Sequence, residues 1–112
     1  MTRHDDNVRL RHMLDNTREA MAIAADRRRA DLDGDRLLEL GLVRLIEIVG
    51  EAAAKVTDDF RSDHPQIPWP QIVAMRNRLV HGYDEIDLDV LWDTIRDDLP
   101  SLATELAKLL ES

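Results

Sequence analysis

The 112-residue sequence contains no cysteine, which excludes disulfide bonds, thiolate metal sites and a cysteine nucleophile. Aromatic residues make up only 4% of the chain, too few for a surface on which successive nucleic-acid bases stack. No apolar run approaches the ~20 residues of a membrane-spanning helix, and the first residues lack the apolar segment of a secretory signal. We therefore expect a cytoplasmic protein without membrane contact, folded as a single domain over residues 1–112.

Positive charge is also scarce, because 15 Lys and Arg face 23 Asp and Glu and leave a net charge of −8. That total argues against a protein that coats nucleic acid through bulk charge. The acids are unevenly spread, since residues 84–112 hold nine of them against two bases, whereas residues 64–83 hold none. The acid-free stretch fits either a partly buried segment that excludes charge or a local anion site, because nearby carboxylates would repel a phosphate.

The spacing of apolar residues predicts an all-α fold without a sheet. Helices are expected over residues 6–28, 35–60 and 70–81. A further helix is expected from residue 87, which Pro100 either kinks or breaks into two helices near Leu99.

Residues at the expected helix ends support these boundaries. Asp35 and Asp87 are suitable N-caps, Pro70 fits the first turn of its helix, and Gly82 offers a C-terminal stop. In the second helix, Gly50 and the three alanines that follow at 52–54 form a patch of small residues. Such a patch permits close helix approach, either inside the bundle or across a subunit interface.

Arg76 is out of place on the expected helix 70–81, where it falls in the middle of the apolar arc. An unpaired buried cation is costly, so Arg76 must pair with a carboxylate, line a cleft, or meet an anion at an interface. Glu51, on the second helix, is either an exposed residue or the partner of such a cation. On an ideal helix Arg76 and His81 lie about 140° apart and would not converge on one target. Convergence requires the helix to end near Gly82, or two copies of it to meet about a dimer axis.

The segment Arg76–Tyr83 resembles the HEPN ribonuclease motif in its HepT-like form, which is Arg, four residues, His, one residue, Tyr. Three other segments look similar to the same family: residues 44–52, the Ile-Pro-Trp sequence at 67–69, and residues 90–95. The resemblance extends from about residue 10 to 110. It implies a HEPN-type up-and-down bundle of four to five helices that forms a homodimer, with the two motifs facing a shared cleft.

The resemblance also implies an activity, that of a metal-independent endoribonuclease serving as the toxin of a toxin–antitoxin pair. Arg76 and His81 are then the catalytic residues, and Asn77, Arg78 and Glu51 are expected to support them. The chemistry agrees, because an imidazole exchanges protons near neutrality and a guanidinium offsets charge on a phosphate. RNA is the expected substrate. We expect neither DNA binding nor a cofactor. No metal is expected either, since the four histidines show no ligand spacing with carboxylates.

The expected partner is a small nucleotidyltransferase of the MNT type, which in this family silences the toxin by transferring AMP from ATP onto the motif tyrosine, here Tyr83. One alternative is a non-catalytic HEPN subunit that binds nucleotide or substrate for a nucleotidyltransferase partner. Another is a purely structural dimeric bundle. Judged without the resemblance, His81 fits a helix C-terminal cap, Tyr83 a core-edge aromatic, and Arg76 one half of a buried ion pair.

Overall fold

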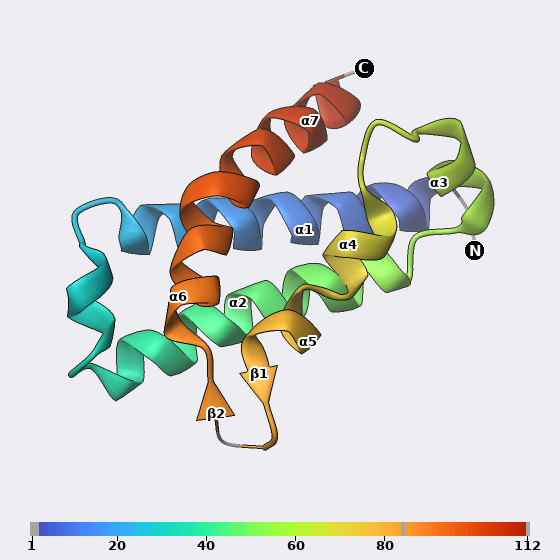
Figure 1. The fold of residues 1–112 in the computed structure, drawn as a ribbon. Coiled ribbons are helices and arrows are strands. Elements are labelled where there is room, and N and C mark those ends of the chain that lie inside the picture. Colours follow the sequence, from blue (N-terminus) through green and yellow to red (C-terminus); the bar gives the residue numbers. More distant parts are fainter. Residues whose placement is uncertain (1–2, 84, 112) are drawn as a thin grey trace.

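Two long antiparallel helices form the base of the molecule in the computed structural model, which describes residues 3–83 and 85–111 (Figure 1). They are α1, Arg3–Ala24, and α2, Arg36–Ala54, connected through the short 3-10 helix η1, Arg29–Leu32. The side chain of Asp35 accepts a hydrogen bond from the amide of Leu38 (3.0 Å), which confirms its predicted role as the N-cap of α2.

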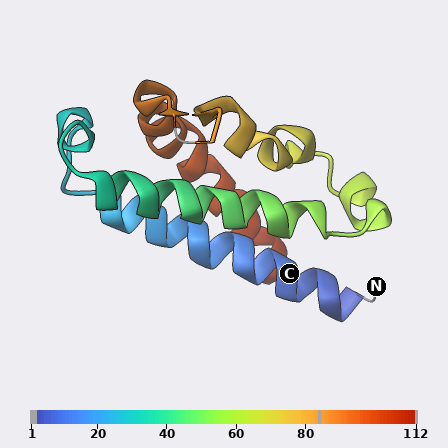
Figure 2. The same ribbon diagram turned by 90° about the horizontal axis from the view of Figure 1, so that it is seen from below.

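The remaining elements cover this pair of helices and run diagonally across it (Figures 1 and 2). In chain order they are α3, Asp58–Asp63; α4, Trp69–Val73; α5, Met75–Leu79; β1, Val80–His81; β2, Glu85–Ile86; α6, Leu88–Asp93; the π-helix η2, Thr94–Asp98; and α7, Leu99–Glu111. Helices α4 and α5 pack on α2, and α7 packs on α1. None of the described helices is long and apolar enough to cross a lipid bilayer.

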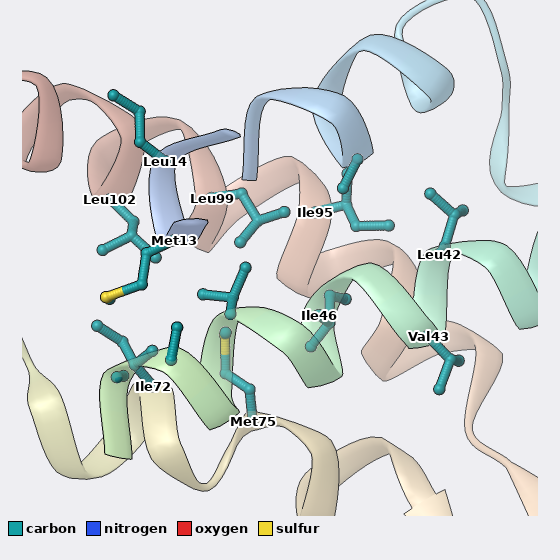
Figure 3. Close-up of a cluster of buried hydrophobic side chains, with 14 of the residues drawn as sticks. Met13, Leu14, Leu42, Val43, Ile46, Ile72, Met75, Ile95, Leu99 and Leu102 are labelled. Atoms are coloured by element: carbon teal, nitrogen blue, oxygen red, sulfur yellow. The ribbon is translucent and has the colours of Figure 1, made fainter. Parts of the chain in front are cut away.

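The hydrophobic core lies between the two long helices and the segments that cross them (Figure 3). Met13 of α1, Ile46 of α2 and Leu99 of α7 are almost completely inaccessible to solvent. Side chains from α4, α5 and η2, including Ile72, Met75 and Ile95, reach the same core. Helix-spaced apolar stripes thus build the predicted all-α bundle, because each stripe is removed from water by the others.

The first two helices are shorter than predicted. Helix α1 ends at Ala24 instead of residue 28, and α2 ends at Ala54 instead of residue 60. The helix does not continue past Thr57, because the Thr57 hydroxyl caps a new helix, α3, by accepting a hydrogen bond from the amide of Phe60 (3.3 Å). The buried carboxylate of Asp6 then fixes this cap, accepting from the amide (2.9 Å) and from the hydroxyl (2.7 Å) of Thr57. The prediction of one helix over residues 35–60 was therefore wrong, because a new helix starts at Thr57.

The prediction of one helix over residues 70–81 and the absence of a sheet were also wrong. The chain is interrupted at Ala74 between α4 and α5, and α5 ends at Leu79. Residues 80–81 pair antiparallel with residues 85–86 in a small hairpin, which projects from the bundle in Figure 1. Gly82 has a φ of +73° in the hairpin turn, so it is not the stop of a helix. Strands of two residues carry too little alternation to appear in a sequence pattern.

Three other boundary predictions are confirmed. Pro70 lies in the first turn of α4, where its missing amide hydrogen costs nothing. Asp87 caps α6 by accepting from the amide of Val90 (3.1 Å). The chain changes helix type at Leu99, where the π-helix η2 gives way to α7 with Pro100 in its first turn.

The small-residue patch of α2 serves the interior of the bundle. A Cβ added at Gly50 would lie 3.1 Å from the carbonyl oxygen of Ile72 and 3.4 Å from that of Val73. Both are backbone atoms at the end of α4, which cannot withdraw as a flexible side chain could. Gly50 therefore allows α4 to approach α2 closely, and this approach sets the position of α5 and of Arg76.

Candidate functional site

Arg76 lies in the first turn of α5 and faces α2. Its Nε donates a hydrogen bond to Oε2 of Glu47 at 2.6 Å, while 48% of the Arg76 side chain remains exposed. Glu47 also accepts from Arg44, through its other carboxylate oxygen, at 2.7 Å. Partial burial alone would raise the pKa of Glu47, but the hydrogen bonds from Arg44 and Arg76 lower it below its ordinary value. Glu47 is therefore an anion at neutral pH that holds two guanidinium groups.

An open hollow of about 480 Å³ lies beside this pair, between α2 and the α4–α5 segment. Its walls are Glu47, Gly50, Glu51, Ala54, Val73, Arg76 and Asn77. The expectation that Arg76 pairs with a carboxylate or lines a cleft is confirmed on both counts. Arg76 is half exposed and is not enclosed in an apolar arc, because the interruption at Ala74 and the end of the helix at Leu79 replace the continuous helix on which that arc was drawn.

The sequence suggested Glu51 as a partner of Arg76. In the structure the partner is Glu47. Glu51 lies one turn further along α2, shares the hollow, and instead contacts Arg44 at 3.3 Å. The two glutamates are four residues apart on one helical face, so periodicity cannot distinguish them. The choice depends on where α5 crosses α2, which the close approach at Gly50 fixes.

Asn77 and Arg78 follow Arg76 but face different surroundings. Asn77 lines the same hollow as Arg76. Arg78 lies instead beside the π-helix η2, with a guanidinium nitrogen 3.5 Å from Oδ2 of Asp98. It lines a separate hollow of about 540 Å³ between α4–α5 and α7. Of the two neighbours expected to support Arg76, one shares its hollow and the other does not.

His81 and Tyr83 lie on the hairpin. His81 is the last residue of β1, opposite Glu85 in the register, and 54% of its side chain is exposed. Its Nε2 lies 3.6 Å from Oδ2 of Asp87. Tyr83 is fully exposed in the turn beyond it. A helix cap for His81 and a core-edge position for Tyr83, the two structural interpretations, are both excluded by these positions.

Asp87 was recognised in the sequence only as a helix cap. The pKa of its carboxyl is held below its ordinary value, first by the hydrogen bond from the amide of Val90 and further by its contact with His81. Asp87 is thus a fixed anion beside the imidazole. Asp84, three residues earlier in the sequence, falls outside the described residues.

Within one chain, the structure gathers Arg76, Asn77 and Glu51 around one hollow, and His81 and Tyr83 on the adjacent hairpin. Neither hairpin residue lines the hollow. In the described parts of the chain, no group of three or more His, Asp and Glu side chains is arranged to hold a metal ion. What these side chains offer chemically is an exposed cation, an exposed imidazole with an adjacent carboxylate, and an accessible phenol.

Known proteins resemble the chain over most of its length. A profile described as "Ribonuclease HepT-like" matches residues 13–109. A relative from Thermococcus cleftensis, named "Probable ribonuclease HepT", is 40% identical over 75 residues, or 67% of this chain and 68% of the relative. "Putative RNase MJ1380" from Methanocaldococcus jannaschii is 28% identical over 106 residues, or 95% of this chain and 97% of the relative. No solved structure matches the chain. The family resemblance suggested by Arg76, His81 and Tyr83 is thereby confirmed, and the chain belongs to the HepT-like ribonuclease family.

Proposed function

We propose that this chain, as a single HEPN domain, is a metal-independent endoribonuclease that acts as the toxin of a toxin–antitoxin pair in the cytoplasm. The observation that carries the proposal is the exposure of all three motif residues on a chain of this family. Arg76 is half exposed at a hollow, His81 is half exposed on the hairpin, and Tyr83 is fully exposed. Residues that only stabilised the fold would not all be directed to the surface, because their contribution would come from burial.

The proposed reaction uses the 2′-hydroxyl of RNA as the nucleophile. One imidazole accepts the 2′-hydroxyl proton while the 2′-oxygen bonds to phosphorus, and the bond from phosphorus to the 5′-oxygen breaks. A protonated imidazole delivers a proton to that 5′-oxygen. The products are a 2′,3′-cyclic phosphate and a 5′-hydroxyl. Arg76 stabilises the negative charge that gathers on the non-bridging oxygens.

A homodimer would supply both the base and the acid of this reaction. The mechanism needs an acid and a base, and each chain offers one exposed motif histidine. Two motifs that face a shared cleft supply two imidazoles and two guanidinium groups. The separation of His81 from the hollow of Arg76 within one chain supports the same arrangement, which light scattering tests as a mass of two chains.

The function is tested by incubating the purified protein with RNA in the presence of EDTA. We expect cleavage that leaves 2′,3′-cyclic phosphate ends, and no cleavage of DNA of the same sequence, because DNA lacks the 2′-hydroxyl. Intact RNA, or cleavage that EDTA abolishes, would contradict the proposal.

We further propose that an MNT-type nucleotidyltransferase silences the chain by modifying Tyr83. The phenolic oxygen would bond to the α-phosphorus of ATP, with pyrophosphate as the leaving group. Full exposure of Tyr83 supports this, since an enzyme must enclose the phenol to modify it. An adenylyl group adds negative charge and bulk next to His81, where the phosphate of the RNA has to bind.

Co-expression with such a partner is expected to increase the mass of the chain by one adenylyl group and to suppress RNA cleavage. Tyr83→Phe should block both effects while leaving the fold unchanged, because the ring makes no buried contact. Intact-protein mass spectrometry and the RNA assay are the measurements. An equal mass increase in Tyr83→Phe would show that the modification occurs on another residue.

The alternative function, a non-catalytic subunit that binds nucleotide or substrate for a nucleotidyltransferase, has one observation in its favour. Arg76 is already paired with Glu47 through its Nε at 2.6 Å, so part of its charge is offset before it meets a phosphate. This alternative predicts a tight complex with the nucleotidyltransferase, intact RNA, and loss of partner activity when the chain is removed.

A further inference from the structure

Asp87 is held in place at the junction of the hairpin and α6. Its backbone amide donates to the carbonyl of Leu79 (2.7 Å), which closes the base of the hairpin. Its Oδ1 accepts from the amide of Val90 (3.1 Å) as the N-cap of α6. Capping uses only one carboxylate oxygen, and the other, Oδ2, lies 3.6 Å from Nε2 of His81. The carboxylate therefore has a fixed orientation with one oxygen directed at the imidazole.

We propose that Asp87 is a positioning residue for His81, which holds the imidazole by Nε2 and stabilises its protonated form. The inference rests on the proposed ribonuclease function and adds a residue to that site. A distance of 3.6 Å is longer than a hydrogen bond but within range of an ion pair, so the contact is strongest when the ring is charged.

In the part of the chain that the structure describes, the other charged groups near His81 have different contacts. Glu85 is opposite His81 in the register but is exposed on the hairpin. Asp89 is directed to Arg29, which donates to its Oδ1 at 2.7 Å. On the side of α5, Arg78 is engaged by Asp98. Tyr83, in the turn, is fully exposed.

The consequence for catalysis follows from the two ring nitrogens. With Nε2 beside Asp87, Nδ1 is the nitrogen left for the substrate, and it has no hydrogen-bond partner among the described residues. A nearby anion favours the imidazolium, which is the form that donates a proton. Asp87 thus prepares His81 to protonate the 5′-oxygen that leaves.

Asp87→Asn separates this role from capping, because asparagine is as good an N-cap as aspartate but carries no charge. The matched control is Asp35→Asn. Asp35 also caps a helix with Oδ1, and its Oδ2 faces a cation, Arg27, at 3.8 Å, but it lies at the start of α2 and has no contact with His81. The full-length protein is studied by nitrogen-15 NMR of the His81 ring at one fixed pH, with the ring signals identified by their absence from His81→Ala, together with kcat and KM for RNA cleavage.

We expect the His81 ring signals to change in Asp87→Asn, because the ring loses the anion beside its Nε2. The kcat should fall about 2- to 5-fold with KM unchanged, whereas Asp35→Asn changes neither the ring signals nor kcat. Unchanged ring signals in Asp87→Asn would overturn the proposal, and so would changed signals with an unchanged kcat. If the protein cleaves no RNA, the ring signals still test the contact between Asp87 and His81, so failure of the proposed function is distinguishable.

Discussion

Replacing His81 by alanine is expected to reduce RNA cleavage by about 10²- to 10⁴-fold, the range typical of a lost general acid or base. In the proposed mechanism the His81 imidazole carries the proton, and in the proposed dimer of identical variant chains both copies are lost. Because 54% of the side chain is exposed, its removal leaves no cavity, and the thermal transition should stay close to that of the parent protein. Initial rates on a defined RNA, with circular dichroism on the same samples, are the measurements.

The control for this variant is His12→Ala. His12 is an exposed histidine on α1 that is not among the walls of the hollow of Arg76 and lines a neighbouring hollow on the far side of Glu51. The same chemical change at this position should leave the cleavage rate unchanged. Full activity in a folded His81→Ala protein would contradict the catalytic assignment, and an equal loss in both variants would indicate a contaminating nuclease or a general effect on the protein.

The helical framework could be predicted from the sequence because the residues that a helix buries recur along the chain at helical spacing. The stripe of α2 that contains Leu42, Ile46 and Val49 is the one buried in the structure. The errors lie where local capping competes with that periodicity. Thr57 starts a new helix inside an apolar pattern, and Ala74 interrupts another with no glycine or proline to mark it. Local backbone changes of this kind do not alter the spacing of apolar residues.

The candidate site was predictable as a set of residues but not as an arrangement. Motif spacing singled out Arg76, His81 and Tyr83 through the resemblance to the HepT-like motif. Their directions depend on the hairpin, which ends α5 two residues before His81. The contact with Glu47 depends on the crossing of α5 over α2, a tertiary feature. For the same reason Asp87 could be recognised as a helix cap and not as a neighbour of the imidazole.

Arg76→Ala is expected to lower RNA cleavage by about 10²- to 10³-fold, the usual loss when one donor that stabilises transition-state charge is removed. Stability should change by about 1 kcal/mol or less, because the Arg76–Glu47 pair is partly exposed and Glu47 keeps its bond to Arg44. Arg76→Lys should recover only part of the rate, since an ammonium group cannot bind two phosphate oxygens in the planar fashion of a guanidinium. Cleavage kinetics and urea denaturation of the same variants separate the two effects.

Two further variants distinguish a catalytic role of Arg76 from a structural one. Glu47→Gln removes the anion that holds Arg76 but keeps the guanidinium, so a catalytic Arg76 predicts that cleavage persists. Arg36→Ala removes a comparable pair on α2, Arg36–Glu39 at 2.9 Å, outside the walls of the hollow, and should not affect cleavage. A purely structural bundle predicts the opposite pattern, in which Arg76→Ala and Glu47→Gln destabilise the protein alike and neither changes an activity.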